Sequence, residues 1–205
     1  NSNLYSLSAR IGEWGALSLP RPTLRDTPEE TRAGLRQTLA LRPDAIVTTG
    51  GISAGDLDFV REVARELGDD TRVRRVSMKP GKPLVDGTIA GVPFFGLPGN
   101  PAACLVSFEM FVRPALARME GRGDGLLPRR RARIREGRRF PHGGRLQLLR
   151  GIVRHDADTA EYTLEPLRSQ GSHLLSSFAG ANCLVEIPAH VSELRAGEMV
   201  SVLLL

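Results

Sequence analysis

The chain has 205 residues, of which 41% are hydrophobic and 25% are charged, and its formal net charge is +5. These values are typical of a soluble globular protein with one large domain or two small ones. No apolar run approaches ~20 residues, which excludes a membrane-spanning helix. The start lacks the form of a signal peptide and the two cysteines show no metal-ligand spacing, so we expect a cytoplasmic protein.

Helix and strand patterns alternate through the first part of the chain. Thr27 and Pro28 are typical of a helix start, and the Ala90-Gly91 pair predicts a hairpin turn. Pro114 is expected to kink or split the last helix because proline removes a backbone donor. This order predicts a three-layer α/β domain over residues 1–122, with a mostly parallel sheet covered on both faces. In chain order we expect helix 4–14, strand 16–19, helix 28–42, strand 45–49, helix 59–67, strand 73–78, hairpin 83–97 and helix 101–119.

Only strand-length runs follow, and they predict a small all-β barrel domain over residues 123–205. Its arginine-rich start, residues 128–139, carries much of the net positive charge. A solvated linker and first strand explain that run better than an RNA-binding surface, because aromatic residues for base stacking are scarce there. We therefore expect no nucleic-acid partner.

The segment TTGGISAGDLD (residues 48–58) links a predicted strand to a predicted helix. Its glycines, Gly50 and Gly51, let backbone N–H groups approach a ligand closely, and the following helix N-terminus favours an anion. Thr49 and Ser53 add hydroxyl donors. Taken alone, a segment of this kind more often only connects a strand to a helix than binds a ligand.

Two carboxylates, Asp56 and Asp58, follow in the same segment. Asp56 is expected to cap the helix. Asp58 beside an anion site would repel a phosphate unless a cation lay between them, and Mg²⁺ commonly takes one or two carboxylates plus substrate oxygens. We therefore predict that Asp58 is a metal ligand, and that the substrate is phosphorylated or carries a nucleotide.

A second strand-to-helix loop has the sequence LPGNP (residues 97–101). Asn100 suits the N-cap of the following helix and Pro101 suits its first turn. In an open α/β sheet, loops at the carboxyl ends of strands line the crevice where ligands bind. The same residues also suit an ordinary turn and helix cap, so by themselves they are weak evidence for a binding site.

Only two of the 28 lysine and arginine residues are lysines, Lys79 and Lys82, and both lie in the turn MKPGKP (residues 78–83). The prolines keep this turn stiff, which reduces the entropy lost when two ammonium groups converge on a ligand. Two like charges this close repel each other, so a dianion or polyanion between them would relieve a cost. The alternative is an exposed basic turn without a ligand.

These motifs together resemble those of the molybdopterin molybdotransferases, the family of MoeA and the gephyrin E-domain. The segments TTGGISAGDLD, MKPGKP and GLPGNP are similar to three family loops, and GRLQLLRG and SQGSHLLSSFAGANCLVEIP are similar to the family's C-terminal barrel. The resemblance covers nearly the whole chain, as the C-terminal part of a longer enzyme. It implies molybdenum cofactor biosynthesis, in which molybdenum from molybdate is inserted into adenylated molybdopterin, AMP is released and Mg²⁺ assists.

The resemblance also implies a role for each matching residue. Lys79 and Lys82 would hold molybdate or the phosphates as a clamp for a tetrahedral oxyanion, and Pro83 would shape the pocket. Ser53 and Asp58 would contact the adenylate and its Mg²⁺. The other implied binding residues are Thr49, Gly50, Gly51, Asp56, Pro98, Gly99, Asn100 and Pro101, with Arg145, Arg150 and Ser172 from the barrel.

The sequence departs from the family pattern in two places. Ala103 stands where the family usually has a serine that contributes a hydroxyl. The chain begins at a segment that follows the family's first strand and its Thr-Gly-Asp-Glu turn, so we expect a sheet edge without a partner. The family implies a homodimer whose N-terminal domains complete the site, and a contact with molybdopterin adenylyltransferase.

Two other functions stay open at this point. Molybdopterin adenylyltransferase has a similar Gly-Gly loop and Pro-Gly-Asn-Pro turn, but it normally lacks the barrel and the paired lysines. A catalytically incomplete scaffold of the gephyrin E-domain type would bind a peptide in a groove between its last domains. Peptide binding without molybdate-dependent AMP release would favour the scaffold.

Overall fold

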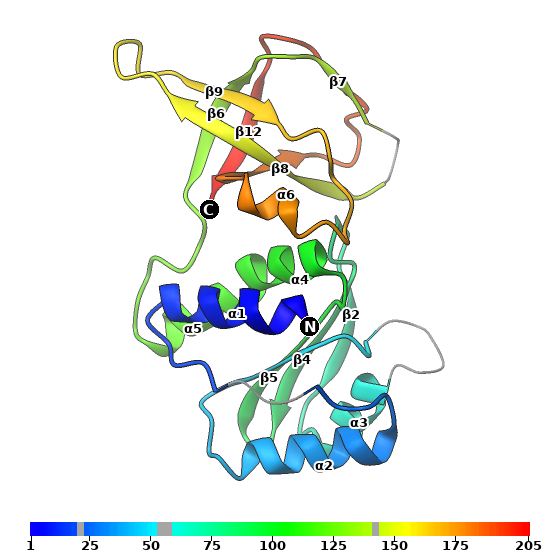
Figure 1. Ribbon diagram of the computed structural model, residues 1–205. Helices are drawn as coiled ribbons and strands as arrows, with labels where there is room; N and C mark the ends of the chain where they lie inside the picture. The colour runs from blue at the N-terminus through cyan, green and yellow to red at the C-terminus, as the bar shows by residue number, and fades with distance from the viewer. Residues whose placement is uncertain (20–22, 53–58, 141–143) are drawn as a thin grey trace.

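The computed structural model describes residues 1–19, 23–52, 59–140 and 144–205. Figure 1 shows an α/β domain, which contains α1 to α5, and a barrel domain, which contains β6 to β12. The predicted order of an α/β domain followed by a small all-β barrel domain is thereby confirmed. The sequence predictions for Ser53, Asp56 and Asp58 lie outside the described residues. Within the described ranges, no helix is long and apolar enough to cross a membrane.

The first three helices of the α/β domain begin and end near the predicted positions. They are α1 (Ser2–Glu13), α2 (Pro28–Leu39) and α3 (Phe59–Leu67). The hydroxyl of Thr27 accepts a hydrogen bond of 3.2 Å from the backbone N–H of Glu30, which satisfies one of the free donors at the start of α2.

The sheet of the α/β domain has the strand order β1-β5-β4-β2. Its strands are β1 (Ile46–Thr49), β2 (Arg72–Arg75), β4 (Pro83–Ile89) and β5 (Val92–Leu97). Among these described strands only β1 and β5 run parallel, so the prediction of a mostly parallel sheet is wrong in strand direction. The two-residue turn between β4 and β5 can join only antiparallel neighbours, and β2 also pairs antiparallel with β4.

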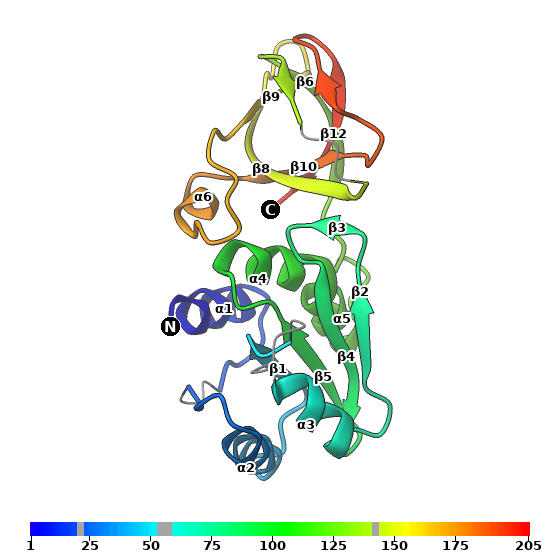
Figure 2. The same ribbon diagram turned by 90° about the vertical axis from the view of Figure 1, so that its right-hand side faces the viewer.

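The sheet is covered on both faces, as Figures 1 and 2 show. Helix α1 and the helices that follow β5 pack on one face around Leu7, Leu97 and Phe108. Helices α2 and α3 pack on the other face around Leu35 and Val63. The edge of β1 that does not pair with β5 has no strand beside it among the described residues.

The predicted strand at residues 16–19 is wrong. These residues form no strand, and Leu17 and Leu19 are 83% and 52% exposed. Alternating apolar residues favour a strand only where a partner supplies backbone hydrogen bonds. None of the described strands pairs with this segment.

The long apolar helix is split, as Pro114 predicts. It consists of α4 (Pro101–Ser107), the π-helical turn η1 (Phe108–Val112) and α5 (Arg113–Met119). The backbone N–H of Arg113 donates to the carbonyl of Phe108, five residues back. Proline cannot donate the next hydrogen bond of the ladder, so a wider turn just before it costs little.

Five strands close the barrel: β6 (Arg129–Ile134), β8 (Leu146–His155), β9 (Tyr162–Pro166), β10 (Cys183–Ile187) and β12 (Met199–Leu204). They follow the order β10-β12-β6-β9-β8, and β8 pairs again with β10 to complete the ring. The β6–β9 pair is parallel and the other four pairs are antiparallel. The predicted strand runs of the second half are therefore confirmed.

Shorter elements lie around the barrel. Strands β7 (Arg138–Arg139) and β11 (Glu193–Leu194) pair with each other outside the ring. A short helix, α6 (Ser176–Ala179), was not predicted and lies beside the α/β domain in Figure 1.

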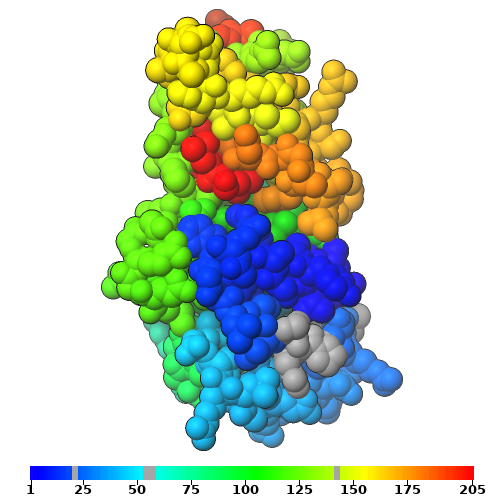
Figure 3. Space-filling model, turned by 60° about the vertical axis from the view of Figure 1, so that its left-hand side comes forward, coloured from blue at the N-terminus to red at the C-terminus, as the bar shows by residue number. Residues whose placement is uncertain are grey.

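A sixth strand, β3 (Met78–Lys79), comes from the α/β domain and joins the barrel sheet. It pairs parallel with β8, with Met78 opposite Leu146 and Lys79 opposite Gln147. The expected strand 73–78 is therefore two strands, β2 and β3, in two different sheets. The domains are also in contact on the face shown in Figure 3, without an open gap between them. One apolar cluster spans this junction and contains Met78, Val106, Leu127, Leu148, Leu184 and Leu203.

Candidate functional site

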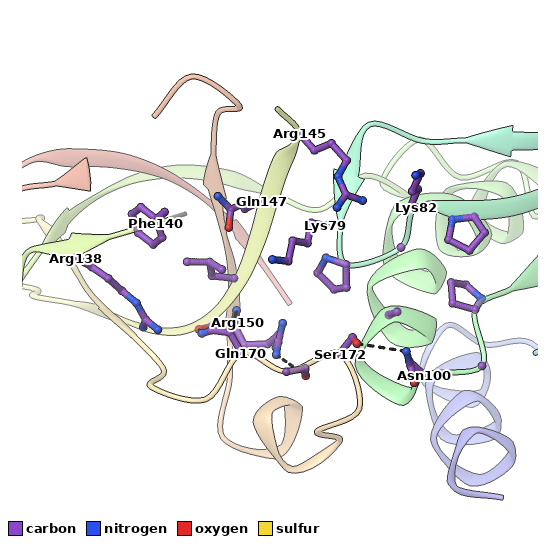
Figure 4. Close-up of a pocket in the computed structure, with 18 of the residues that line it drawn as sticks. Lys79, Lys82, Asn100, Arg138, Phe140, Arg145, Gln147, Arg150, Gln170 and Ser172 are labelled. Atoms are coloured by element: carbon purple, nitrogen blue, oxygen red, sulfur yellow. Dashed lines mark hydrogen bonds between the residues drawn. The ribbon is translucent and has the colours of Figure 1, made fainter. Parts of the chain in front are cut away.

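A pocket of about 500 Å³ lies between the two domains. Figure 4 shows its side chains, with the β3 turn and the start of α4 on one side and the barrel on the other. The lining consists of residues 79–83, 98–100, 103, 138–140, 145, 147, 149, 150 and 170–172.

The turn of Lys79 and Lys82 is held from both ends. The backbone N–H of Val76 donates to the carbonyl of Lys82 at 2.8 Å, which closes the turn. Gly81 has a φ of +101°, and a Cβ added there would come within 2.8 Å of the Ser107 hydroxyl. The turn therefore requires glycine both for its backbone conformation and for its contact with α4.

The two lysine side chains leave this turn in different directions. In Figure 4, Lys79 extends toward the barrel side of the pocket, where Gln147 and Arg150 lie, whereas Lys82 points away from that side. Both lysines are exposed to solvent, so a dissolved ion can reach them. The sequence predicted that both would hold one anion, and this arrangement favours Lys79 for the barrel side.

The pocket carries an excess of positive charge. Its described lining contains no aspartate or glutamate. One lining cation, Arg139, pairs with a carboxylate from outside the lining, that of Glu193, at 3.3 Å. Because the described lining residues include several cations but no carboxylate, the pocket favours the binding of an anion. Within the described part of the chain, five lining cations lie more than 4.0 Å from any carboxylate: Lys79, Lys82, Arg138, Arg145 and Arg150.

Arg150 is the most deeply buried cation of the pocket, with none of its surface exposed. Its Nε donates to the hydroxyl of Ser177 at 3.0 Å, and its Nη2 donates to the carbonyl of Gly171 at 3.1 Å. Its Nη1 has no hydrogen-bond partner within the described residues. Burial lowers the pKa of Arg150 to about 10, so the side chain stays charged at neutral pH. A buried charge without a counter-ion is costly, and an anion in the pocket would offset that cost.

The barrel loop of Ser172 reaches the start of helix α4. The carbonyl of Ser172 accepts a hydrogen bond of 2.9 Å from the backbone N–H of Ala102. The side chain of Asn100 donates to the hydroxyl of Ser172 at 3.3 Å and makes no capping bond to its own helix. Gln170 anchors this loop because its amide bonds to both the backbone N–H and the carbonyl of Arg150, at 2.9 Å and 2.8 Å.

The two glycine-containing loops of the α/β domain touch each other. A Cβ added to Gly99 would lie 3.4 Å from the Cα of Gly50, so their backbones are in contact. The side chain of Asn3 donates to the carbonyl of Gly99 at 2.8 Å and fixes the second loop to α1. The first loop nevertheless faces another cavity, of about 760 Å³, beside β1.

The structure thus brings together only part of the predicted site. Thr49, Gly50 and Gly51 line the cavity beside β1, and Pro101 begins α4 without lining the pocket. Ala103 forms pocket wall at the position where a serine hydroxyl was expected. The predicted residues that do line the pocket are Lys79, Lys82, Pro83, Pro98, Gly99, Asn100, Arg145, Arg150 and Ser172.

Several lining residues were not predicted from the sequence. Arg138 and Arg139 were assigned to the arginine-rich linker and first strand, and Phe140 was not singled out. Gln147 had one recognisable signal, since it is a polar residue inside the apolar run LQLL. A polar side chain that folding buries is uncommon unless it is paired or functional. Gln170 had no such signal, because its role depends on contacts with a distant strand.

No metal centre is formed by the described residues. Among them, no group of three or more histidine, cysteine, aspartate or glutamate side chains is placed to hold a metal ion. Burial raises the pKa of the Cys104 and Cys183 thiols to about 12, so both stay protonated in the apolar interior at neutral pH. The predicted metal ligand, Asp58, lies outside the described residues.

An α/β domain joined to a closed β-barrel, with a cationic pocket between them, defines a two-domain protein of the α/β-plus-barrel class. Residues 1–118 match the family model described as "Probable molybdopterin binding domain", and residues 128–205 match the model described as "MoeA C-terminal region (domain IV)". The chain therefore belongs to the MoeA family of molybdopterin-binding proteins.

Named relatives agree with this family. Molybdopterin molybdenumtransferase 2 of Mycobacterium tuberculosis is 37% identical over 206 residues, which cover 98% of this chain and 49% of the relative. Molybdopterin molybdenumtransferase of Haemophilus influenzae is 31% identical over 159 residues, covering 78% of this chain and 39% of the relative. A crystal structure of the molybdopterin biosynthesis MoeA protein from Pyrococcus horikosii matches with a TM-score of 0.80 and 32% identity, covering 98% and 47% of the two chains. The chain thus spans about half the length of the relatives it matches, or less.

Proposed function

We propose that the chain is the part of a molybdopterin molybdenumtransferase that binds molybdate and adenylated molybdopterin. The complete enzyme would transfer molybdenum into the pterin and release AMP. The observation that carries this proposal is the pocket between the domains, where five cations lack a carboxylate partner among the described residues. The names of the relatives support the same reaction.

The chemistry of the reaction explains the need for such a pocket. Molybdate is a dianion, and an adenylated pterin carries phosphate groups, so the two substrates repel each other. Fixed positive charges offset this repulsion, and they act more strongly where the surrounding protein excludes water. A lining without carboxylates leaves those charges available to the substrates. The barrel and the paired lysines also favour this reaction over that of the adenylyltransferase.

The proposal includes features that depend on residues or partners outside the described chain. Mg²⁺ would be held by Asp58 together with substrate oxygens, since the described lining supplies no carboxylate. Ser53 would contact the adenylate from the same loop. We also propose a cytoplasmic homodimer whose N-terminal domains complete the site, and a contact with molybdopterin adenylyltransferase that delivers the substrate.

The test is AMP release from adenylated molybdopterin, measured with and without molybdate and Mg²⁺. It should be run on this chain alone and on the chain fused behind the N-terminal half of its Mycobacterium tuberculosis relative. We expect molybdate-dependent release from the fused protein. Absence of release from both proteins, with oxyanion binding retained, would contradict the enzyme and favour the scaffold.

A further inference from the structure

Arg138 is a cation of the pocket whose guanidinium bonds to two consecutive backbone carbonyls. It lies on β7, and its Nη1 donates to the carbonyl of Leu167 at 2.8 Å. Its Nη2 donates to the carbonyl of Arg168 at 3.0 Å. Both carbonyls belong to the segment between β9 and α6, of which residues 167–172 are here called the pocket loop. Two donors of Arg138 therefore hold this loop.

The carbonyl of Leu167 connects Arg138 to the residue that anchors the pocket loop on the barrel. It also accepts a hydrogen bond of 2.7 Å from the side-chain amide of Gln170. The same amide bonds to both backbone groups of Arg150 on β8. A carbonyl oxygen has two lone pairs, so both donors can bond to it at once. Arg138 and Gln170 together fix the pocket loop against the barrel.

The other end of the pocket loop forms part of the pocket and reaches the second domain. The carbonyl of Gly171 accepts a hydrogen bond of 3.1 Å from Nη2 of the buried Arg150. The carbonyl of Ser172 accepts one of 2.9 Å from the backbone N–H of Ala102, in the first turn of α4. A shift of this loop would therefore disturb both a buried cation of the pocket and the contact between the domains.

We propose that Arg138 is a positioning residue of the oxyanion pocket, which acts by holding the pocket loop and not by contacting the anion. Figure 4 shows Gln170 and Ser172 between Arg138 and the start of α4. A planar guanidinium can hold two neighbouring carbonyls at once, and a loop that is already held loses less entropy when a ligand binds. The inference rests on the proposed anion-binding function and adds to it the residue that keeps this loop in place.

Two measurements on the 205-residue chain test the proposal. Isothermal titration calorimetry with molybdate and with sulfate gives the affinity. Amide hydrogen exchange without ligand, followed by NMR, reports on the pocket loop through the N–H of Ala102, which the carbonyl of Ser172 protects. The N–H of Leu204 donates to the carbonyl of Pro128 at 2.9 Å elsewhere in the barrel and serves as the internal control. A loss of global stability would speed the exchange of both amides.

Three variants separate the geometry of Arg138 from its charge. Arg138→Met keeps an apolar side chain of similar length and removes the charge and both donors. Arg138→Lys keeps the charge but not the planar arrangement of donors. Arg154→Met is the matched control, because it removes one positive charge from an exposed strand end that does not line the pocket.

We expect Arg138→Met to weaken molybdate binding about tenfold and to speed the exchange of Ala102 by a similar factor, because two hydrogen bonds from a charged group are lost. Exchange of Leu204 should stay within about twofold. Arg138→Lys should show most of the same losses. Arg154→Met should leave affinity and exchange within about twofold, since exposed charges at a distance are screened by salt.

The outcomes separate this inference from the proposed function. If Arg138→Met weakens binding without speeding the exchange of Ala102, Arg138 contacts the anion directly and the positioning role is wrong. Full affinity in Arg138→Lys would show that only its charge matters, and faster exchange with unchanged affinity would show that the pocket does not depend on the loop. Either result leaves the proposed function standing. If the unaltered chain binds neither molybdate nor sulfate, the proposed anion site is itself wrong and the inference falls with it.

Discussion

The pocket between the domains depends on a few cations that pair with no carboxylate among the residues that the structure describes. Lys79 and Arg150 both line it, and Arg150 is fully buried. Lys79 and Gln147 are register partners where strand β3 of one domain meets strand β8 of the other, whereas Arg150 is held by Ser177 and Gly171. An anion that fills the pocket would therefore offset costs that folding alone leaves in place.

Replacement of Lys79 tests the charge of this pocket directly. We expect Lys79→Ala to weaken molybdate binding by about 1.5–3 kcal/mol, which is typical for a hydrogen bond to a charged group. Lys82→Ala should cost less, because Lys82 points away from the barrel side in Figure 4. Calorimetry measures both.

A matched control separates a contact from a change in net charge. Arg154→Ala also removes one positive charge, but from an exposed strand end that does not line the pocket. Equal losses of affinity in Lys79→Ala and Arg154→Ala would show that only the overall charge of the chain matters.

Among the elements, the split helix after β5 contains the most deeply buried ion pair of the described residues. Glu109, in the π-helical turn η1, has a side chain that is 1% exposed and pairs with both Arg10 and Arg113. The Nε of Arg10 donates to Glu109 at 2.7 Å, and the guanidinium of Arg113 stacks 3.9 Å from the ring of Trp14. Burial lowers the pKa of Arg113, and the neighbouring Glu109 carboxylate opposes this shift. This network fixes α1 against η1 and α5.

Loss of the Glu109 charge should destabilise the α/β domain strongly. We expect Glu109→Gln to lower the free energy of unfolding by about 3–5 kcal/mol, because Arg113 would keep a buried charge without a partner. Glu13→Gln removes the other carboxylate that pairs with Arg10, but its side chain is 58% exposed, so we expect a loss below about 1 kcal/mol. Urea unfolding, followed by the fluorescence of Trp14, measures both values, and similar losses would contradict this account.

Local signals predicted some elements well and others poorly. The Thr27 cap, the Ala90-Gly91 turn and the break before Pro114 are all formed as predicted, because each depends on residues within one or two turns. The strand at 16–19 was wrong, since its pattern had no partner strand. Strand directions in the sheet were also wrong, because alternation of helices and strands does not reveal which connections are hairpins.

At the scale of the whole molecule, the two domains are held together by a ladder and an apolar cluster. Strand β3 extends the barrel sheet, and Leu148 lies fully buried between the domains. This contact sets the position of β8, which carries Gln147 and Arg150, relative to Lys79. The boundary at residues 122 and 123 stays a prediction.

Shortening an apolar side chain at the junction between the domains should therefore reduce both the stability of the chain and its affinity for molybdate. We expect Leu148→Ala to lower the free energy of unfolding by about 2–5 kcal/mol and also to weaken molybdate binding. Leu164→Ala, at an equally buried position in the barrel core, should cost a similar amount of stability with a smaller effect on binding. Urea unfolding and calorimetry compare them, and a loss of affinity as large in Leu164→Ala would show that the junction has no special role.

The sequence by itself determined the class of each domain, the stiff lysine turn and the family, because these are written in periodicity and in contiguous motifs. The tertiary structure decided which of the candidate residues share a pocket. It separated Gly50 and Gly51 from the lysines, turned Lys79 toward the barrel, and placed Lys79 opposite Gln147 in a pocket that Arg150 also lines. These positions depend on the parallel pairing of β3 with β8, a contact between segments almost seventy residues apart, which local sequence patterns do not specify.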